Sequence, residues 1–428
     1  PLSACEIGAG GPELSEELRE KRRKDELSLI KDKESVFMGA VEPVDFMGDR
    51  RHYYIWLEAE GPLKSRVTLD AWIKFEEGPL LCDPLLGALS AIYESKIKGE
   101  IGPVKTLAPF FKSRRPSDFK VASATEHESA KCPFCAGKED ETPPANYLLI
   151  KEGGSYIEAK DEVGKPRLTG WSVRVIPNLY PAFSTEVGAL TAPPKGIPPP
   201  EQAYGYHEVI VESPVHDQHF WLAPEEQRQL VLRAIMNRIE FFSRDKRISA
   251  IVPFRNHGRD AGASLSHAHT QIVASAHLPP VLDGEDRAFS RGFSLLSLAE
   301  SESESPRSVY SNSKFFAFAM WAGTTPYSFM IVPKEQAPSP LNADISALSD
   351  VLSKTLRALA VTLNDPPFNL VWHIAPLPWS AHQLFHWHLE VYPKLSVWAG
   401  YEIGSGTYIN VVTPEEAAKY LRQAAQKL

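Results

Sequence analysis

Polar and apolar residues alternate along a short stretch of the chain, from His267 to Ala274. Alternation with a period of two is typical of a β-strand that has one polar and one apolar face. The pattern predicts that His267, His269 and Gln271 project from the same face of this strand. Such a row is either a set of hydrogen-bonded residues on the solvated face of a sheet or a reaction centre. We favour a reaction centre, because histidines, an amide, a serine and loop glycines are concentrated here.

The elements around this strand are predicted twice, in the same order. Between residues 205 and 274 the hydrophobic pattern predicts a strand, a helix, a second strand and the alternating strand. Between residues 327 and 391 it predicts the same four elements, with a second His-x-His motif, His386 and His388, on the last strand. The motif follows its first strand at nearly the same distance in both copies, which indicates an internal duplication.

We therefore predict an α/β (α+β) fold of two tandem halves, each an antiparallel sheet with packed helices, plus an N-terminal extension. A chain of 428 residues is too long for one ordinary core. A Ser/Glu run at residues 301–305 marks the boundary between the halves. The predicted domains are an extension of unknown role at 1–104, a first half at 105–300 and a second half at 306–428.

Charge and hydropathy narrow the class of partner. The net charge of −8 disfavours a general nucleic-acid binder, since phosphate backbones are held mainly by excess Lys and Arg. No apolar run is long enough to span a bilayer, and the N-terminus lacks the basic-then-apolar layout of a signal peptide. We expect a soluble, cytoplasmic protein with neither nucleic acid nor membrane as a partner.

The four cysteines do not make a disulfide framework in a chain of this size. Cys132 and Cys135 form a Cys-x-x-Cys pair, the spacing at which two thiolates hold one tetrahedral ion. A thioredoxin-like redox pair is the alternative, but no β-α-β pattern surrounds the motif. The pair predicts structural zinc, which needs two more ligands from elsewhere in the chain.

The ordered set of motifs resembles the galactose-1-phosphate uridylyltransferase family. This family is a branch of the histidine-triad superfamily, which also includes nucleoside-diphosphosugar and dinucleotide phosphorylases. The motifs are Cys132-x-x-Cys135, Ser213-Pro214-Val215-His216, the segment from Ser264 to Gln271, and His386-x-His388. The resemblance covers roughly Thr106 to the C-terminus. It implies two histidine-triad-like halves and a homodimer in which the partner's C-terminal segment completes the sugar pocket.

The resemblance also implies an activity. The family moves a nucleoside monophosphate from a nucleoside-diphosphosugar to a hexose 1-phosphate, through a covalent nucleotidyl-histidine and with ping-pong kinetics, in galactose metabolism. His269 matches the nucleophile, and a neutral imidazole suits an anionic phosphate because it avoids charge repulsion. Gln271 matches the amide that donates to the phosphate oxygens. Further matches to substrate-binding positions are Lys112, Arg115, Asn178, Asn256, Ser264, Tyr401, Glu402 and Tyr408.

Two metal sites follow from the same resemblance. The zinc set is Cys132, Cys135, His216 and His267. The second set is Glu285, His373, His386 and His388, whose carboxylate and imidazoles suit iron or zinc. The zinc site belongs to the predicted catalytic half, and the second site belongs to the other half.

Some positions depart from the uridylyltransferase pattern. Leu179 stands where those enzymes carry an acidic residue, and the Gly-Ser-Gly run at 404–406 is closer to the nucleotide-sugar phosphorylase branch. The Glu285 metal set favours the transferases. The main hypothesis is therefore a hexose-1-phosphate uridylyltransferase-like enzyme, and the alternative is a nucleoside-diphosphosugar or dinucleotide phosphorylase that uses inorganic phosphate. A nucleotide sensor without turnover is disfavoured, because His269 and Gln271 are both present.

Overall fold

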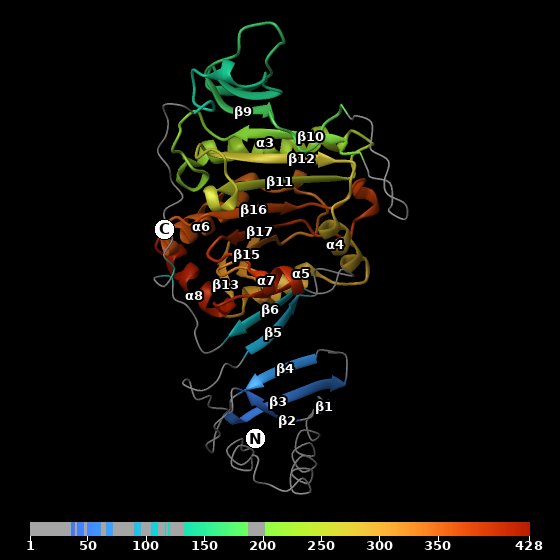
Figure 1. Cartoon of the computed structure of the whole chain (residues 1–428). Coiled ribbons are helices and arrows are strands. Elements are labelled where there is room, and N and C mark those ends of the chain that lie inside the picture. Colours follow the sequence, from blue (N-terminus) through green and yellow to red (C-terminus); the bar gives the residue numbers. More distant parts are fainter. Residues whose placement is uncertain are drawn as a thin grey trace. The chain divides into compact units, whose positions relative to one another are not determined.

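The computed structural model describes residues 132–186 and 202–428, the single residues Pro116 and Phe119, and the backbone of six strands between residues 36 and 109 (Figure 1). The chain divides into two compact units. Unit 1 comprises residues 1–94, 105–114 and 398–413, and unit 2 comprises residues 95–104, 115–397 and 414–428. The domain boundaries expected from the sequence stay a prediction.

A seven-stranded sheet belongs mainly to unit 1 and has the order β1-β3-β4-β5-β6-β18, with β2 paired to β3. Its strands are β1 (Val36–Met38), β2 (Val41–Phe46), β3 (Asp49–Glu60), β4 (Arg66–Ala71), β5 (Ser90–Ser95), β6 (Val104–Pro109) and β18 (Thr407–Ile409). β18 follows the short helix α7 (Gly400–Ser405) and pairs parallel to β6. A segment near the C-terminus thus joins the sheet of the N-terminal strands.

Unit 2 is built on an eleven-stranded sheet with the order β13-β14-β15-β17-β16-β11-β12-β10-β9-β7-β8. Its strands are β7 (Tyr147–Glu152), β8 (Ser155–Ala159), β9 (Trp171–Pro177), β10 (Gly205–Val211), β11 (Ala250–His257), β12 (His269–Ser275), β13 (Ser308–Ser311), β14 (Phe315–Ala319), β15 (Phe329–Pro333), β16 (Phe368–His373) and β17 (His388–Pro393). The pairings between these strands are antiparallel.

The strand order shows the internal duplication directly. Outward from the central pair β11 and β16, one side of the sheet runs β12, β10, β9 and the other runs β17, β15, β14 (Figure 1). Each half also contributes one helix of nineteen residues, α3 (Glu225–Ser243) and α6 (Ile345–Leu363), between its second and third matching strands. The predicted fold of two tandem α/β halves with antiparallel strands and packed helices is confirmed.

Local sequence explains the two long helices. α3 buries Leu230, Ala234 and Ile239 at helical spacing, and it contacts both α6 and the strands of the first half. α6 begins after Asp344, whose side chain accepts a hydrogen bond from the Ala347 N–H. The sequence pattern predicted this helix from residue 341, but the capping carboxylate starts it later, and residues 340–342 form a separate 3₁₀ turn.

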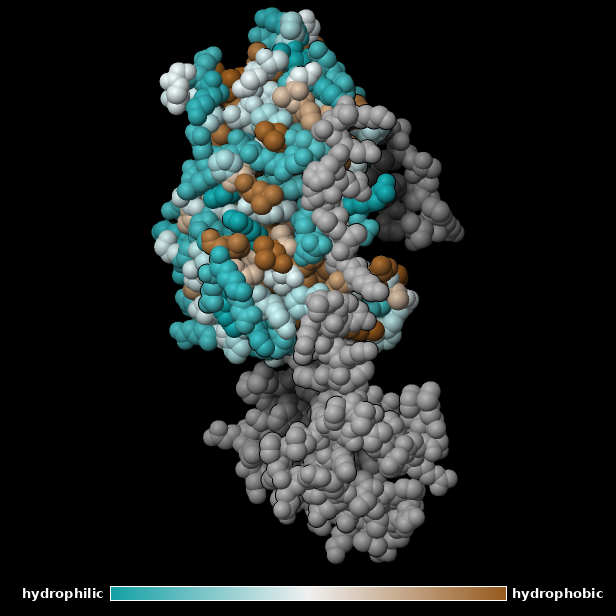
Figure 2. Space-filling model, turned by 90° about the vertical axis from the view of Figure 1, so that its left-hand side faces the viewer, coloured by the Kyte–Doolittle hydropathy of each residue, from teal (hydrophilic) through white to brown (hydrophobic). Residues whose placement is uncertain are grey.

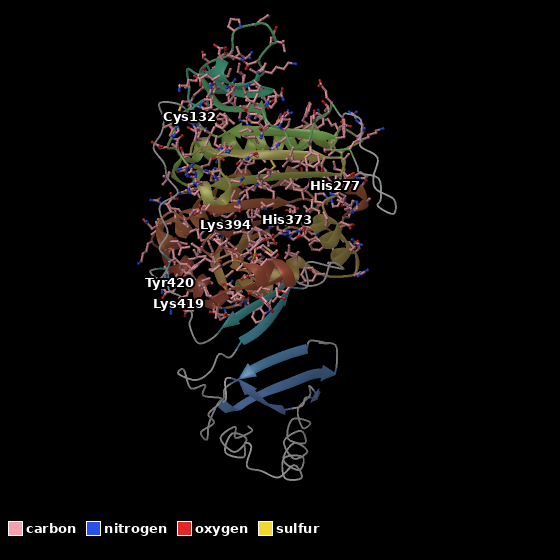
Figure 3. The ribbon with its side chains drawn as sticks, in the orientation of Figure 1. Cys132, His277, His373, Lys394, Lys419 and Tyr420 are labelled. Atoms are coloured by element: carbon pink, nitrogen blue, oxygen red, sulfur yellow. The ribbon has the colours of Figure 1, made fainter. Side chains whose placement is uncertain are left out.

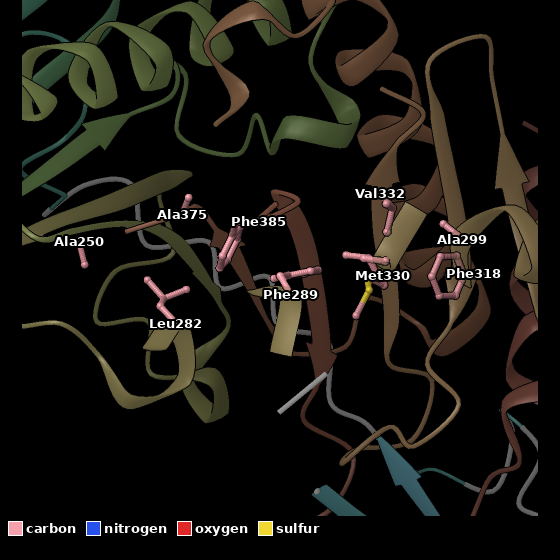
Figure 4. Packing of buried hydrophobic residues seen from close by; sticks show 10 residues of the cluster. Ala250, Leu282, Phe289, Ala299, Phe318, Met330, Val332, Ala375 and Phe385 are labelled. Carbon is pink, nitrogen blue, oxygen red and sulfur yellow. The ribbon is translucent and has the colours of Figure 1, made fainter. Parts of the chain in front are cut away.

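Two shorter helices, α4 (Pro280–Ser290) and α5 (Leu295–Ser303), connect the halves. Figure 4 shows the apolar cluster that they form with the second half, in which Phe289 of α4 lies against Phe385 with ring centroids 4.9 Å apart. Phe318 of β14 and Met330 of β15 complete it from neighbouring strands, where they are register partners. This packing fixes α4, which carries Glu285, against the sheet. The last helix is α8 (Pro414–Ala425).

On the face drawn in Figure 2, the hydrophobic residues form small separate groups in a mostly hydrophilic surface. Within the described part of the chain, no helix is long and apolar enough to cross a membrane.

Candidate functional site

Four predicted zinc ligands lie together at one end of the first half. Cys132 and Cys135 come from a turn before β7, His216 follows β10, and His267 precedes β12. β10 and β12 are antiparallel neighbours, so the end of one strand and the start of the next meet at the same edge of the sheet. The four possible ligand atoms all lie within 4.8 Å of one another. Figure 3 labels Cys132 in this group.

Hydrogen bonds fix the ring orientation of the two histidines. Nε2 of His267 lies 2.8 Å from the carbonyl oxygen of Ser213, so it donates its proton there. Its Nδ1, with the lone pair, then faces the Cys132 sulfur at 3.5 Å. Nδ1 of His216 faces the Cys135 sulfur at 3.4 Å, and its Nε2 is 3.1 Å from Ser266 Oγ. Burial, followed by the neighbouring Cys132, raises the pKa of Cys135 to about 11. A cation would reverse this by stabilising the thiolates.

His269 is the first residue of β12, and its ring carries the proton on the opposite nitrogen from that of His267. Its Nδ1 lies 2.8 Å from the carbonyl oxygen of His267, so Nδ1 carries the proton and Nε2 carries the lone pair. Burial lowers the pKa of His269, which keeps the ring neutral. The ring of Phe134, in the cysteine turn, packs edge-on against it at 5.6 Å between centroids. The structure therefore presents a fixed, neutral imidazole whose unprotonated nitrogen is Nε2.

Gln271 and His269 share one face of β12, opposite Val209 and Val211 of β10. The alternation inferred from the sequence is correct, although the strand begins at His269 rather than His267. Nδ2 of Asn178 lies 3.4 Å from Gln271 Oε1, so the structure brings these two predicted residues together. Between them lies His207, which the sequence motifs did not single out. β10 reads Gly-Tyr-His-Glu-Val-Ile-Val, in which polar and apolar residues do not alternate, so the sequence pattern offered no signal for His207.

Asn256 lies near the end of β11, and Ser264 lies in the loop between β11 and β12. Oδ1 of Asn256 accepts a hydrogen bond of 2.9 Å from Asn369 Nδ2, which leaves the Asn256 NH2 group available as a donor. Gly258 and Gly262 adopt positive φ angles of 80° and 88°, a backbone conformation that favours glycine. Ser264 is exposed in this loop. The loop and the adjoining end of β11 therefore offer glycines and side-chain donors, and their contact with a phosphate stays a prediction.

A second group of possible ligands lies in the other half. Glu285 of α4, His373 of β16, and His388 and Glu390 of β17 are all buried, and their ligand atoms lie within 4.8 Å of one another. Figure 3 labels His373, whose Nδ1 is 2.9 Å from Glu285 and whose Nε2 is 3.0 Å from Glu390. Although burial alone would lower it, these two carboxylates raise the pKa of His373 to about 10. The group therefore favours a positive charge at its centre.

Relatives of known function resemble the chain over most of their length. The ADP-glucose phosphorylase of Arabidopsis thaliana is 33% identical over 327 residues, which are 73% of this chain and 88% of that protein. The chain belongs to the galactose-1-phosphate uridylyltransferase family. The galactose-1-phosphate uridylyltransferase of Thermotoga maritima is 27% identical over 264 residues, 58% of this chain and 82% of that enzyme. A family model described as a domain of unknown function (DUF4921) matches residues 217–428.

A solved structure supports the same assignment within the uridylyltransferase family. The crystal structure of an Arabidopsis thaliana ADP-glucose phosphorylase with bound ADP-glucose superposes with a TM-score of 0.61 at 28% identity, and covers 78% of this chain and 99% of that one. The chain is therefore a nucleotidyl-transferring enzyme with the histidine-triad fold. Identity is greater to the phosphorylase than to the transferase, so the similarity supports the alternative hypothesis of phosphorolysis better than the main one.

One predicted metal ligand lies outside the group that the structure brings together. His386 is not among these four residues, and both of its ring nitrogens contact the backbone, so its role as a ligand stays a prediction. Its Nε2 is 2.9 Å from the carbonyl oxygen of Pro333, and its Nδ1 accepts the N–H of Ala337 at 3.3 Å. Glu390, two residues beyond His388, takes its place. The signal was available, since Glu390 stands where Gln271 stands in the first half.

Several predicted substrate residues are not joined to this site by the structure. Lys112 and Arg115 lie outside the described residues. Tyr401, Glu402 and Tyr408 belong to unit 1, on α7 and β18. There Glu402 accepts a hydrogen bond from the Ala399 N–H, and the ring of Tyr408 packs against that of Trp398. Their place in a uridylyltransferase-family sugar pocket stays a prediction.

Proposed function

We propose that the chain is a nucleoside-diphosphosugar phosphorylase that acts on an ADP-sugar. The observation that carries this proposal is the 33% identity to an ADP-glucose phosphorylase over 88% of that protein. The turn after β9 supports it, because Leu179 is exposed there and offers an apolar surface in place of the acidic residue of the uridylyltransferases. Nucleoside monophosphate transfer from the ADP-sugar would use His269 as the acceptor in the first step.

The orientation of His269 suits an in-line attack on phosphorus. Nε2 carries the lone pair, so it would form the N–P bond with the α-phosphorus while the bond to the sugar phosphate oxygen breaks. Sugar 1-phosphate then leaves. His267 O holds the Nδ1 proton and stabilises the positive charge that develops on the ring. Gln271 and Asn256 would donate their NH2 groups to the phosphate oxygens.

In the second step the acceptor is inorganic phosphate. One of its oxygens attacks the α-phosphorus, the N–P bond breaks, and His269 returns as the neutral imidazole. The product is a nucleoside diphosphate, so phosphate replaces the hexose 1-phosphate that a transferase would use. The nucleophile and the phosphate-binding amides would be the same for both acceptors.

The test is a donor and acceptor screen. The chain is incubated with ADP-, UDP- or GDP-glucose labelled in the α-phosphate, and the label bound to protein is measured. Labelled protein is then discharged with phosphate or with galactose 1-phosphate. We expect ADP-glucose to label the protein and phosphate to discharge it as ADP. Discharge by galactose 1-phosphate alone would show that the chain is a transferase, and the absence of label with every donor would contradict the mechanism.

The donor atoms of the first group fit zinc. Two sulfurs and two Nδ1 lone pairs are the ligand set that zinc prefers, and the other ring nitrogen of each histidine already has a partner. Zinc at Cys132, Cys135, His216 and His267 would anchor the strand that carries His269.

The second group also fits a cation. Nδ1 of His388 donates to His386 O, and within the described structure its buried Nε2 has no hydrogen-bond partner. We propose that Glu285, His373, His388 and Glu390 hold zinc or iron. Metal analysis of the purified protein by inductively coupled plasma mass spectrometry tests both sites. Homodimer formation and a cytoplasmic location stay predictions.

A further inference from the structure

His207 of β10 lies between two residues with different predicted roles. Asn178 is one of the predicted substrate-binding residues, and Gln271 is expected to contact the phosphate. Nε2 of His207 lies 2.9 Å from Gln271 Oε1, and Nδ2 of Asn178 lies 3.4 Å from the same oxygen. The proposed mechanism gives His207 no role.

A backbone group decides which ring nitrogen of His207 carries the proton. The N–H of Ala182 donates to Nδ1 of His207 at 3.1 Å. A backbone N–H is only a donor, so Nδ1 must be the unprotonated nitrogen. Burial lowers the pKa of His207 more than its bond to Gln271 raises it, so the ring is neutral and its proton is on Nε2. Nε2–H therefore donates to Gln271 Oε1.

A second backbone group orients Asn178 in the same way. The N–H of Tyr180 donates to Asn178 Oδ1 at 2.9 Å, which turns Nδ2 toward Gln271 and His207. Asn178 Nδ2 and His207 Nε2 are 3.1 Å apart, close because both donors converge on one acceptor. With two donors at this position, Gln271 must present its carbonyl oxygen to them. Its NH2 group is then the end that faces away from the turn, on the strand face shared with His269.

We propose that His207 is a positioning residue for nucleotidyl transfer, which holds the Gln271 amide with its NH2 group directed toward the transferred phosphate. The inference rests on the proposed function, because that function gives Gln271 its contact with the phosphate. An amide without these donors would occupy two orientations of similar energy, and one of them would turn a carbonyl oxygen toward the anionic phosphate. The turn at residues 178–182 thereby controls the polarity of a group in the reaction centre.

Two substitutions separate this role from a purely structural one. In His207→Gln the side-chain NH2 replaces Nε2–H as a donor to Gln271. In His207→Asn the side-chain oxygen replaces Nδ1 as the acceptor for Ala182, but no donor reaches Gln271. We expect His207→Gln to keep the rate of His269 nucleotidylation within about twofold, and His207→Asn to lower it about three- to tenfold, which is the value of one net hydrogen bond. KM for the donor should change less than kcat.

The same pair is then measured in a Gln271→Ala background. If His207 acts through Gln271, His207→Asn should cause no further loss there. A loss of equal size in both backgrounds, or a greater loss for His207→Gln than for His207→Asn, would show that His207 only supports the turn and would overturn the inference. Thermal unfolding of each variant confirms that the fold is intact.

A measurement that does not depend on activity separates this inference from the proposed function. Ring ¹⁵N chemical shifts of histidine-labelled protein, with His207→Asn used to assign the signal, report which nitrogen is protonated. We expect the Nε2–H form, and an Nδ1–H ring would overturn the inference. If wild-type protein accepts no nucleotide on His269, the proposed function fails, whereas the ring form still decides how His207 is oriented.

Discussion

At the scale of single residues, backbone groups give identical side chains different chemistry. His267 donates from Nε2 to Ser213 O and offers Nδ1 to the cysteines, whereas His269 donates from Nδ1 to His267 O and offers Nε2. The two histidines are separated by a single residue, yet one has the geometry of a metal ligand and the other that of a nucleophile. Their roles should therefore be separable by mutation.

His269→Gly should abolish nucleotidyl transfer and leave the metal content unchanged. The substitution removes the nucleophile, which we expect to lower the rate by at least about a thousandfold. It removes none of the four atoms that would hold zinc. Cys132→Ala is the matched comparison, and it should lower both zinc content and the midpoint of thermal unfolding. Loss of zinc from His269→Gly, measured by mass spectrometry, would contradict this separation of roles.

His219 should make the protein less stable in mild acid. Burial, followed by the nearby Arg255, lowers the pKa of His219 from 6.5 to about 3. Protonation of His219 therefore favours the unfolded chain. The stability that depends on a neutral His219 is complete above about pH 6.5 and is lost as the pH falls toward 3. The other groups near this ring are His257, which packs against it, Asp365, which contacts His257, and Glu212, which pairs with Arg255.

The measurement is urea unfolding at about pH 7.5 and about pH 5. Between about pH 7.5 and about pH 5, the free energy of unfolding should fall by about 2 kcal/mol more in wild type than in His219→Gln. This is the difference expected when a histidine must stay neutral in the folded protein. His277→Gln, which replaces an exposed histidine, is the control and should behave like wild type. Equal losses in wild type and His219→Gln would show that His219 does not contribute.

Sequence motifs identified the residues whose type is itself diagnostic, and they missed residues whose importance depends on partners. Cys132, Cys135 and His269 belong to spacings with a chemical meaning. His207 and Glu390 belong to no spacing of this kind, and only their contacts with Gln271 and His373 reveal their surroundings. Sequence also cannot show that the N–H of Ala337 contacts the Nδ1 of His386, the atom that a metal would need.

At the scale of elements, the pairing of β11 with β16 connects the two halves at the reaction centre. Asn256 and Asn369 are register partners in this pair. Asn369 Nδ2 donates to Asn256 Oδ1 at 2.9 Å and to the carbonyl oxygen of Ala261 at 2.8 Å. A strand of the second half thus orients a predicted phosphate-binding amide of the first half.

Asn369→Asp should weaken transfer without changing the shape of the side chain. A carboxylate cannot donate to Asn256 Oδ1 or to Ala261 O. It would repel the Ala261 carbonyl oxygen, and the Asn256 amide would turn around so that its NH2 group faces the carboxylate instead of the phosphate. We expect kcat/KM to fall about five- to a hundredfold, equivalent to about 1–3 kcal/mol for buried groups left without partners. Asn342→Asp introduces the same charge at an exposed position and is the control. Equal activity of the two variants would exclude this role for Asn369.

The elements themselves were largely predictable, because periodicity depends on local sequence. The long helices and the alternating strands were placed correctly, with errors of a few residues at their ends. For α6 the capping residue Asp344 decides where the helix begins. Pairings between distant segments were not predictable. Nothing local in residues 407–409 indicates that they pair with residues 105–107.

At the scale of the whole molecule, the duplication allows the matching positions of the two halves to be compared residue by residue. His386, His388 and Glu390 occupy the positions of His267, His269 and Gln271. His388 keeps the Nδ1 bond to the carbonyl oxygen of His386 that His269 makes to His267. In the proposed assignment, the change from an amide to a carboxylate at Glu390, together with Glu285 and His373, would turn a site for an anion into a site for a cation.

This comparison makes a prediction about metal content. Glu390→Gln restores the residue of the first half and removes a negative charge that faces His373 and His388. We expect the metal of the second group to be lost, while zinc in the first group and nucleotidylation of His269 are retained. His386→Asn should keep both metals, because the ring nitrogens of His386 contact the backbone at Pro333 and Ala337 and not the four grouped residues. Mass spectrometry should therefore show about one metal per chain in Glu390→Gln and about two in His386→Asn, after thermal unfolding has shown that both variants fold. The opposite result would mean that His386, not Glu390, is the fourth ligand, and that metal binding rearranges the start of β17.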